Sequence, residues 1–547
     1  MRILGIEGTA WAASAAVYET TSPDVLDPDD EWIVIETDAY EPESGGIHPR
    51  EAAEHMREAI PTVVENALEH ARERAAATGE RTDAAPIDAV AFSRGPGLGP
   101  CLRIVATAAR ALAQRLSIPL VGVNHMVAHL EIGRHRSGFE SPVCLNASGA
   151  NAHVLGYRNG RYRVLGETMD TGVGNAIDKF TRHLGWAHPG GPKVEECAED
   201  GEYVWLPYVV KGMDFSFSGI MSAAKQAVDD GEAVEDVCFS LQENVFAMLA
   251  EVSERALSLT DADELVLGGG VAQNARLREI LADMCEQRDA DFFAPDTRFL
   301  GDNAGMIAVL GAKMYDAGDT IAIEDSRVRP DFRPDEVPVT WRADEAVGSW
   351  ADSRDATTVT GAEATVTIEG DRVRKRRHPR TYRHPALDDR LRTERTREEA
   401  RLTGHARRVG VPTPIVYDVD PRECELVFER VGEQDLRADL TRERVREVGS
   451  HLAHIHEAGF VHGDPTTRNV RIDGPLTYLI DFGLGYYTDD AEDYAMDLHV
   501  LAQSLTGTAD EPDRLQAAAE DGYRETADDP GGVLDRLREI EARGRYQ

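Results

Sequence analysis

Short β-rich runs alternate with helical patterns over the first 323 residues, and three of these runs end in a glycine-rich turn. The turns are Gly5–Thr9, Ser148–Asn151 and Gly268–Asn274. Strands that alternate with helices predict an α/β domain. Glycines at such turns let backbone amides approach phosphate oxygens without interference from side chains. One such turn usually marks only a change of chain direction, but three after strands favour a nucleotide cleft.

The chain is too long, at 547 residues, for one ordinary domain. Residues 1–323 make up the predicted α/β domain. Residues 324–355 contain Pro330, Pro334 and Pro338 among scattered charges, and this pattern predicts a linker. A second unit then covers residues 356–547.

The charge balance is strongly acidic, with a formal net charge of −39. Only six of the basic residues are lysines, and the others are arginines. Such a charge destabilises a compact chain in dilute buffer, whereas molar salt shortens the Debye length to about 3 Å. The composition therefore predicts a protein of a salty cytoplasm, and an acidic mesophilic protein is the alternative. Six dispersed cysteines fit a reducing cytoplasm, and no segment predicts membrane insertion.

A histidine pair lies in the segment Val123–Glu131. On a helix, His125 and His129 would share one face, so both imidazoles would reach one metal ion. Most pairs of this kind are ordinary surface or core residues, but Asp302 offers a third ligand. Met126 follows His125, so the His-Glu-x-x-His pattern of a metalloprotease is absent.

The first half resembles the tRNA N(6)-adenosine threonylcarbamoyltransferase family, the catalytic subunit of the KEOPS complex. The matching motifs follow in family order: Gly5–Thr9, Ser93–Gly97, Asn124–Glu131, Ser148–Asn151, Asp178–Lys179, Pro189–Pro192, Gly269–Asn274 and Asp302–Ala308. The resemblance implies a duplicated nucleotide-binding domain of the actin/hexokinase type. It also implies transfer of a threonylcarbamoyl group from threonylcarbamoyl-AMP to the adenosine 3′ of the anticodon, in tRNAs that read codons starting with A.

The resemblance also implies the ligands of this site. Iron or zinc would bind His125, His129 and Asp302. Asn146 stands where archaeal relatives carry a tyrosine ligand, and it offers a carbonyl oxygen instead. The threonylcarbamoyl-adenylate would contact Asn146, Ala147, Ser148, Gly149, Ala150, Asp178, Gly191, Glu195 and Asn274.

The second unit carries the spacing of a protein-kinase catalytic loop. Asp464 and Asn469 form Asp-x-x-x-x-Asn, and Asp481 opens Asp-Phe-Gly. This pattern predicts Asp464 as catalytic base, with Asn469 and Asp481 as Mg²⁺ ligands. Lys375 is the only lysine of this unit and is expected to contact ATP phosphates, paired with Glu399. The nucleotide-covering turn is predicted at Gly361, Ala362, Glu363, Ala364, Thr365 and Val366.

Only 66 residues follow Asp481, and they contain no Ala-Pro-Glu segment, so we expect little room for an activation loop and a peptide-binding lobe. The unit resembles the KEOPS kinase-like subunit. That resemblance implies a small bilobal α+β domain that hydrolyses ATP with Mg²⁺, with Ser/Thr phosphorylation as a weaker activity. Some archaea fuse both subunits, and the other small KEOPS subunits are implied partners.

Arginines cluster in and near residues 372–383 and at the C-terminus of this acidic chain. They are candidates for contact with tRNA phosphates or, alternatively, balance neighbouring carboxylates. The candidates are Arg374, Arg376, Arg377, Arg380, Arg543 and Arg545.

Three other functions compete with a tRNA-modifying enzyme. A small-molecule kinase would use the same type of cleft, but a metal-binding histidine pair would have no use there. A metalloprotease lacks its glutamate. A non-catalytic scaffold would explain Asn146 and Pro465 as marks of decayed sites.

Overall fold

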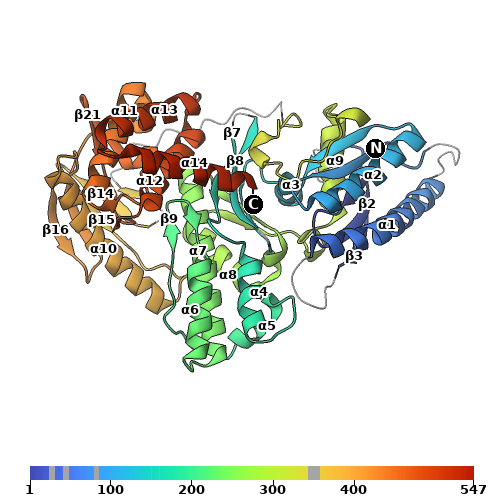
Figure 1. Ribbon diagram of the computed structural model, residues 1–547, viewed down its shortest axis with the longest axis horizontal. Helices are drawn as coiled ribbons and strands as arrows, with labels where there is room; N and C mark the ends of the chain where they lie inside the picture. Colours follow the sequence, from blue (N-terminus) through green and yellow to red (C-terminus); the bar gives the residue numbers. More distant parts are fainter. Residues whose placement is uncertain are drawn as a thin grey trace.

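The computed structural model describes residues 1–23, 31–40, 48–78, 85–149, 151–158, 160–342, 358–361 and 363–546. Figure 1 shows the chain as three parts in a row, with the N-terminal α/β part at one end and the C-terminal part at the other. Among the described residues, no helix combines the length and apolar character that crossing a membrane requires.

The first sheet has the strand order β3-β2-β1-β4-β5. Its strands are β1 Arg2–Glu7, β2 Ala12–Glu19, β3 Trp32–Ala39, β4 Ala89–Gly95 and β5 Leu120–Asn124. β1, β4 and β5 run parallel to one another. β2 pairs antiparallel with β1 on one side and with β3 on the other. Alternate residues of β1 face opposite sides, so Leu4 packs under α1 (Pro49–Ala77) and α2 (Gly99–Leu116), while Ile3 faces α9 (Ala304–Asp316).

The second sheet repeats this topology, in the order β12-β11-β6-β7-β8. Its strands are β6 Val143–Ala147, β7 Ala152–Arg158, β8 Arg161–Glu167, β11 Glu264–Gly268 and β12 Asp291–Phe293. Helix α3 (His125–Ser137) and α9 pack in one core with residues of both sheets. Gly133 permits the close approach of α3, because a Cβ there would lie 2.2 Å from Val266 Cγ1.

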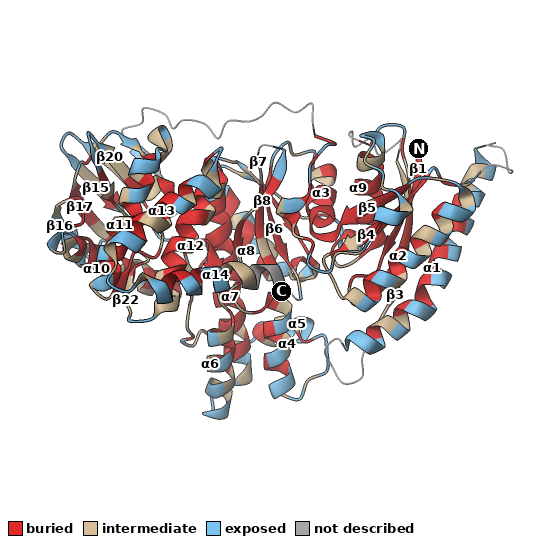
Figure 2. Cartoon of the chain, turned by 45° about the horizontal axis from the view of Figure 1, so that its top comes forward, coloured by how far each residue is buried: buried red, intermediate tan, exposed pale blue. Residues whose placement is uncertain are grey.

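Five helices lie on the other side of the second sheet, two of them against its strands and three packed on these helices or on one another. They are α4 Val173–His183, α5 Gly191–Ala198, α6 Ser218–Asp229, α7 Val234–Thr260 and α8 Ala275–Gln287. A small hairpin, β9 Val210–Lys211 with β10 Asp214–Phe215, lies beside α7. Figure 2 shows α7 and the strands of both sheets largely buried.

The C-terminal part has a sheet and a helical region. The sheet, ordered β13-β14-β15-β17-β16, comprises β13 Thr358–Thr360, β14 Thr365–Glu369, β15 Arg372–Arg376, β16 Val416–Asp420 and β17 Glu425–Glu429. Helix α10 (Pro385–Arg408) packs against β16 and β17. The helical region contains α11 Arg442–Glu457, α12 Ala491–Thr508, α13 Pro512–Thr526 and α14 Pro530–Tyr546. Short strands β18 Gln434–Asp435, β19 Phe460–Val461, β20 Val470–Asp473, β21 Leu476–Leu479 and β22 Tyr486–Tyr487 flank these helices.

Part of the predicted linker packs against the first domain. The amide of Arg329 donates to the carbonyl of Arg94 at 2.8 Å, and Phe332 and Trp341 are buried in the core around α3 and α9. Residues 324–342 therefore belong structurally to the α/β part, whereas residues 343–357 lie outside the described residues.

Candidate metal and nucleotide sites

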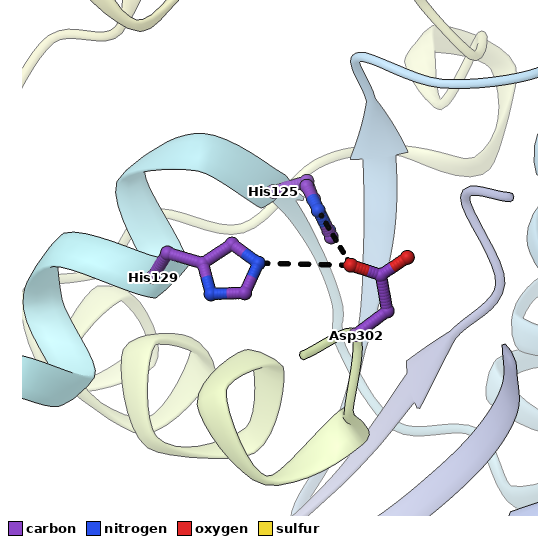
Figure 3. A group of neighbouring side chains, drawn as sticks. All are labelled: His125, His129 and Asp302. Atoms are coloured by element: carbon purple, nitrogen blue, oxygen red, sulfur yellow. Dashed lines mark ion pairs between the residues drawn. The ribbon is translucent and has the colours of Figure 1, made fainter. Parts of the chain in front are cut away.

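The histidine pair opens helix α3, directly after β5. Asn124 starts this helix because its side-chain oxygen accepts the amides of Met126 and Val127 at 3.0 and 3.1 Å. His125 and His129 are one turn apart, and their ring centroids are 4.7 Å from each other. Both side chains point toward the start of α9 (Figure 3).

Asp302 completes the cluster from the turn before α9. Its Oδ1 lies 3.3 Å from His125 Nε2 and 3.7 Å from His129 Nε2, and the three ligand atoms all lie within 4.8 Å of one another. Figure 3 shows the carboxylate facing both imidazoles. Ligands bound at about 2.0–2.2 Å around one ion have comparable separations. The residues therefore fit a metal ion.

The charges around His125 also favour a cation. Burial acts to lower the pKa of His125, but the negative charges of Glu7 and Asp302 outweigh it and raise that pKa to about 10. Burial lowers the pKa of His129, which keeps this imidazole neutral and able to coordinate. Burial opposes ionisation of Asp302, yet both histidines hold its pKa well below the usual range.

Glu7 is a site residue that sequence reasoning missed. Its Oε2 lies 3.2 Å from His125 Nδ1, and its Oε1 accepts the amide of Thr9 at 2.8 Å. The side chain is fully buried at the end of β1. A carboxylate on the second nitrogen orients a metal-binding imidazole and fixes its tautomer. The sequence feature that could have indicated this role is the acidic Glu7 at the end of the otherwise apolar run Ile3–Ile6.

Asn146 is the next-to-last residue of β6, beside α3. Its Nδ2 donates to Met126 Sδ at 3.5 Å, but its buried Oδ1 has no hydrogen-bond partner among the described residues. A buried carbonyl oxygen normally has a partner. This unpaired carbonyl oxygen is therefore available to contact a bound metal ion or substrate.

The second and third glycine turns lie against each other. Gly269 has φ of +86°, and a Cβ there would lie 2.3 Å from the carbonyl oxygen of Ala147. The amide of Ser148 donates to the Asn151 carbonyl at 2.9 Å, and the amide of Asn175 donates to the Gly149 carbonyl at 2.8 Å. Ala150 lies outside the described residues.

The other predicted adenylate contacts are partly engaged within the protein. Asp178 Oδ1 accepts the Gly190 amide at 2.8 Å, and Glu195 Oε1 accepts the Ala275 amide at 2.7 Å. Asn274 caps α8 by accepting the amide of Leu277 at 3.0 Å. Gly191 starts α5. Each carboxylate keeps a second oxygen for further contacts, although Asp178 Oδ2 lies 3.1 Å from His188 Nδ1.

In the C-terminal part, the predicted kinase residues form two contact groups, one at Lys375 and one between Asp464 and Asn469. Lys375 Nζ lies 2.9 Å from Glu399 Oε1 and 2.7 Å from Asp481 Oδ1. Asn469 Nδ2 donates to Asp464 Oδ2 at 3.0 Å. Burial raises the pKa of Asp464 to about 7, although the positive charge of Arg255 partly opposes this rise.

The predicted nucleotide-covering turn leads into β14. The amide of Gly361 donates to the Ala364 carbonyl at 2.9 Å, while Thr365 and Val366 belong to the strand. Ala362 lies outside the described residues. Glu363 forms ion pairs with Arg395, at 3.0 Å, and with Arg255.

Two arginines proposed for tRNA contact are inside the protein, so that prediction was wrong for them. Arg377 is 2% exposed and lies 2.6 Å from Glu399 Oε2. Arg380 pairs with buried Glu254 at 3.0 Å. Arg374 and Arg376 are partly exposed and pair with surface glutamates. The side chains of Arg543 and Arg545 lie outside those described.

Known proteins match the chain over its length. Residues 32–309 match the family "tRNA N6-adenosine threonylcarbamoyltransferase". A "probable bifunctional tRNA threonylcarbamoyladenosine biosynthesis protein" of Haloarcula marismortui is 72% identical over 100% of both chains. The chain belongs to this family. Proteins with the same name from Haloquadratum walsbyi and Methanocorpusculum labreanum are 67% and 49% identical, covering 100% of this chain and 100% and 99% of their own.

Family membership establishes the main activity as threonylcarbamoyl transfer in tRNA modification, in a bifunctional chain. Members of this transferase family generally bind a metal ion. The matches do not favour the small-molecule kinase or the non-catalytic scaffold.

Proposed function

We propose that His125, His129 and Asp302 hold iron or zinc, and that the glycine turns beside them bind threonylcarbamoyl-AMP. The acceptor is N(6) of the adenosine 3′ of the anticodon, in tRNAs that read codons starting with A. The convergence of two buried histidines of α3 with the partly buried Asp302 of the turn before α9 is the observation that carries this proposal.

Glu7 and Asn146 would have different roles at this metal site. Glu7 would hold the His125 imidazole through Nδ1, which leaves Nε2 for coordination. Asn146 would supply its orphaned carbonyl oxygen as a further ligand. A bound iron or zinc ion would act as a Lewis acid toward the donor's carbonyl or phosphate oxygens.

The glycine turns would bind the adenylate that becomes the leaving group. The backbone of the turn at Gly149 would face its phosphate, because glycine has no side chain to block the approach, while the Ser148 amide stays bonded to the Asn151 carbonyl. Asp178 and Glu195 would accept hydrogen bonds from the ribose hydroxyls. Asn274 and Gly191 would border the remaining part of the nucleotide, and Ala147 would support the turn from β6.

The C-terminal domain would be a small kinase-like ATPase of the KEOPS type. Lys375 would contact the α- and β-phosphates while Glu399 orients it. Asp464 would be the catalytic base, and Asn469 and Asp481 would hold Mg²⁺. ATP hydrolysis would support tRNA modification, with protein phosphorylation as a minor reaction.

We further propose that the fused chain works in the cytoplasm with the other small KEOPS subunits. Arg374 and Arg376 stay candidates for tRNA contact because their side chains are partly exposed on β15.

Mass spectrometry of tRNA nucleosides tests the transferase. The full chain would be incubated at high salt with threonylcarbamoyl-AMP, unmodified tRNA and the other KEOPS subunits. Wild type should form threonylcarbamoyladenosine and His125→Ala should not. His183→Ala is the matched control because His183 pairs with Asp229 on the surface. Full transfer by His125→Ala would refute the metal assignment.

ATP hydrolysis tests the second domain. Asp464→Ala should lose ATPase activity, while the control Asp473→Ala, at an exposed position, should keep it. Equal ATPase rates in Asp464→Ala and wild type would reject Asp464 as the base.

A further inference from the structure

Helix α7 of the transferase domain presents charged residues to the kinase-like domain. Glu251, Glu254 and Arg255 share one face of this helix, and they are only 1%, 1% and 7% exposed. Arg383 Nη2 donates to Glu251 at 2.7 Å, and Tyr382 donates to Glu254 at 2.7 Å. This face is therefore a buried interface between the two domains.

Arg255 extends from this face toward the predicted nucleotide-covering turn. Its Nη1 donates to the Gly212 carbonyl at 2.7 Å, and its Nη2 donates to Glu251 Oε1 at 2.6 Å. The same Nη2 pairs with Glu363, a residue of the turn. Two contacts inside the transferase domain thus fix the guanidinium group while it holds a residue of the other domain.

Glu363 connects Arg255 with the predicted ATP site. Its Oε2 lies 3.9 Å from Arg377 Nε, and Arg377 Nη2 lies 2.6 Å from Glu399 Oε2. Glu399 in turn pairs with Lys375. A continuous series of ion pairs, buried except at the partly exposed Glu363, therefore runs from α7 to the lysine expected to contact phosphates.

We propose that Arg255 is a positioning residue of the kinase-like ATP site, supplied by the transferase domain. It would hold the nucleotide-covering turn through Glu363 and neutralise that carboxylate beside the incoming triphosphate. This inference rests on the proposed ATPase function. Molar salt screens surface pairs strongly and buried pairs much less, so the contact would persist in a salty cytoplasm.

The electrostatic effect of Arg255 on the catalytic loop also supports this role. Its charge acts on the Asp464 carboxyl and lowers the pKa of that group against the effect of burial. Arg255 belongs to α7 and Asp464 to the C-terminal domain, so a transferase side chain contributes to the electrostatics of the catalytic loop.

ATP affinity measured in the full-length protein tests the proposal. Fluorescent mant-ATP would be titrated at molar KCl with Mg²⁺, and steady-state ATPase rates would give KM and kcat. Arg255→Gln should raise both Kd and KM for the nucleotide about tenfold, the loss of one charge-assisted contact, with a smaller change in kcat. Arg255→Lys should recover part of the affinity.

Arg288→Gln is the matched control. Arg288 pairs with Glu254 at the same interface but has no recorded contact with Glu363 among the described residues. Its substitution should leave nucleotide affinity unchanged. If Arg255→Gln and Arg288→Gln lost nucleotide affinity equally, the loss would come from disturbed packing at the domain interface and not from the nucleotide-covering turn. That result would overturn the proposal.

A double variant separates positioning from misfolding. In a Glu363→Gln background, Arg255→Gln should change Kd less than about twofold, because the pair is already broken. A persistent tenfold effect would contradict the proposal. Wild type without ATP binding or hydrolysis would refute the ATPase itself, whereas an active wild type with normal Arg255→Gln affinity would refute only this inference.

Discussion

The candidate metal cluster shows which features of single residues can be predicted from a sequence. His125 and His129 were predictable because a four-residue spacing on a helix places two side chains on one face. Asp302 was named from a family motif, since no spacing relates it to residues so distant in the chain. Glu7 was not assigned a role because its partner becomes its neighbour only when β1 and β5 flank β4.

Glu7→Gln should weaken metal binding without removing any ligand. The amide keeps the size of the side chain but loses the charge that orients and polarises His125. Loss of such a partner typically costs about 10- to 100-fold in metal affinity. Competition with a chelator, followed by metal analysis, measures this change. An unchanged affinity would mean that Glu7 has no orienting role.

The strand-to-turn connections are the elements that the sequence defined best. The turns at Ser148 and Gly269 follow strands as predicted, whereas Gly5–Glu7 belong to β1 and the chain leaves this strand only at Gly8. The packing of residues 324–342 was not predictable, because proline and scattered charge indicate a loop and do not say where it docks. The burial of Arg377 was hidden for a similar reason, since its partner Glu399 lies on another element.

Gly269→Ala should disrupt the third turn and adenylate binding. The residue has φ of +86°, and a Cβ would collide with the carbonyl of Ala147 at 2.3 Å. The strain should destabilise the native protein by about 1–3 kcal/mol. Gly270→Ala is the control because a Cβ there meets no atom within 4 Å among the described residues. Chemical unfolding and adenylate titration would compare them, and equal behaviour would contradict the account.

At the scale of the whole molecule, the two domains share a charged interface that the sequence did not predict. Pairs such as Arg383 with Glu251 join residues far apart in the chain. In the sequence, each of these residues looks like an ordinary charged surface residue. A second contact brings His499 of α12 toward Asp214 of β10, with 3.8 Å between Nε2 and Oδ2. Contact between the two domains therefore buries ionisable side chains.

Asp214 should make stability depend on pH. Burial first, and then the charge of Glu167, raise its pKa to about 8. Unfolded aspartate titrates near 3.9, so the folded protein retains a proton that unfolding releases between these pH values. Stability contributed by this group therefore falls as pH rises from about 4 to 8.

Asp214→Asn removes this dependence and keeps an acceptor for the Glu167 amide, now 2.8 Å from Oδ1. The stability gain of the variant over wild type should grow by about 4 kcal/mol between pH 5 and pH 8, at about 1.4 kcal/mol per pH unit below the folded pKa. Urea unfolding at several pH values would measure it. A gain that is constant with pH would contradict the assigned pKa.

We propose that transfer requires one metal ion held by His125, His129 and Asp302. The most direct measurement compares metal content with single-turnover transfer from threonylcarbamoyl-AMP to unmodified tRNA, before and after chelation and metal return. We expect about one ion per chain in wild type, loss of both ion and transfer on chelation, and recovery of both with iron or zinc. A metal-free chain that transfers at the full wild-type rate would contradict the account.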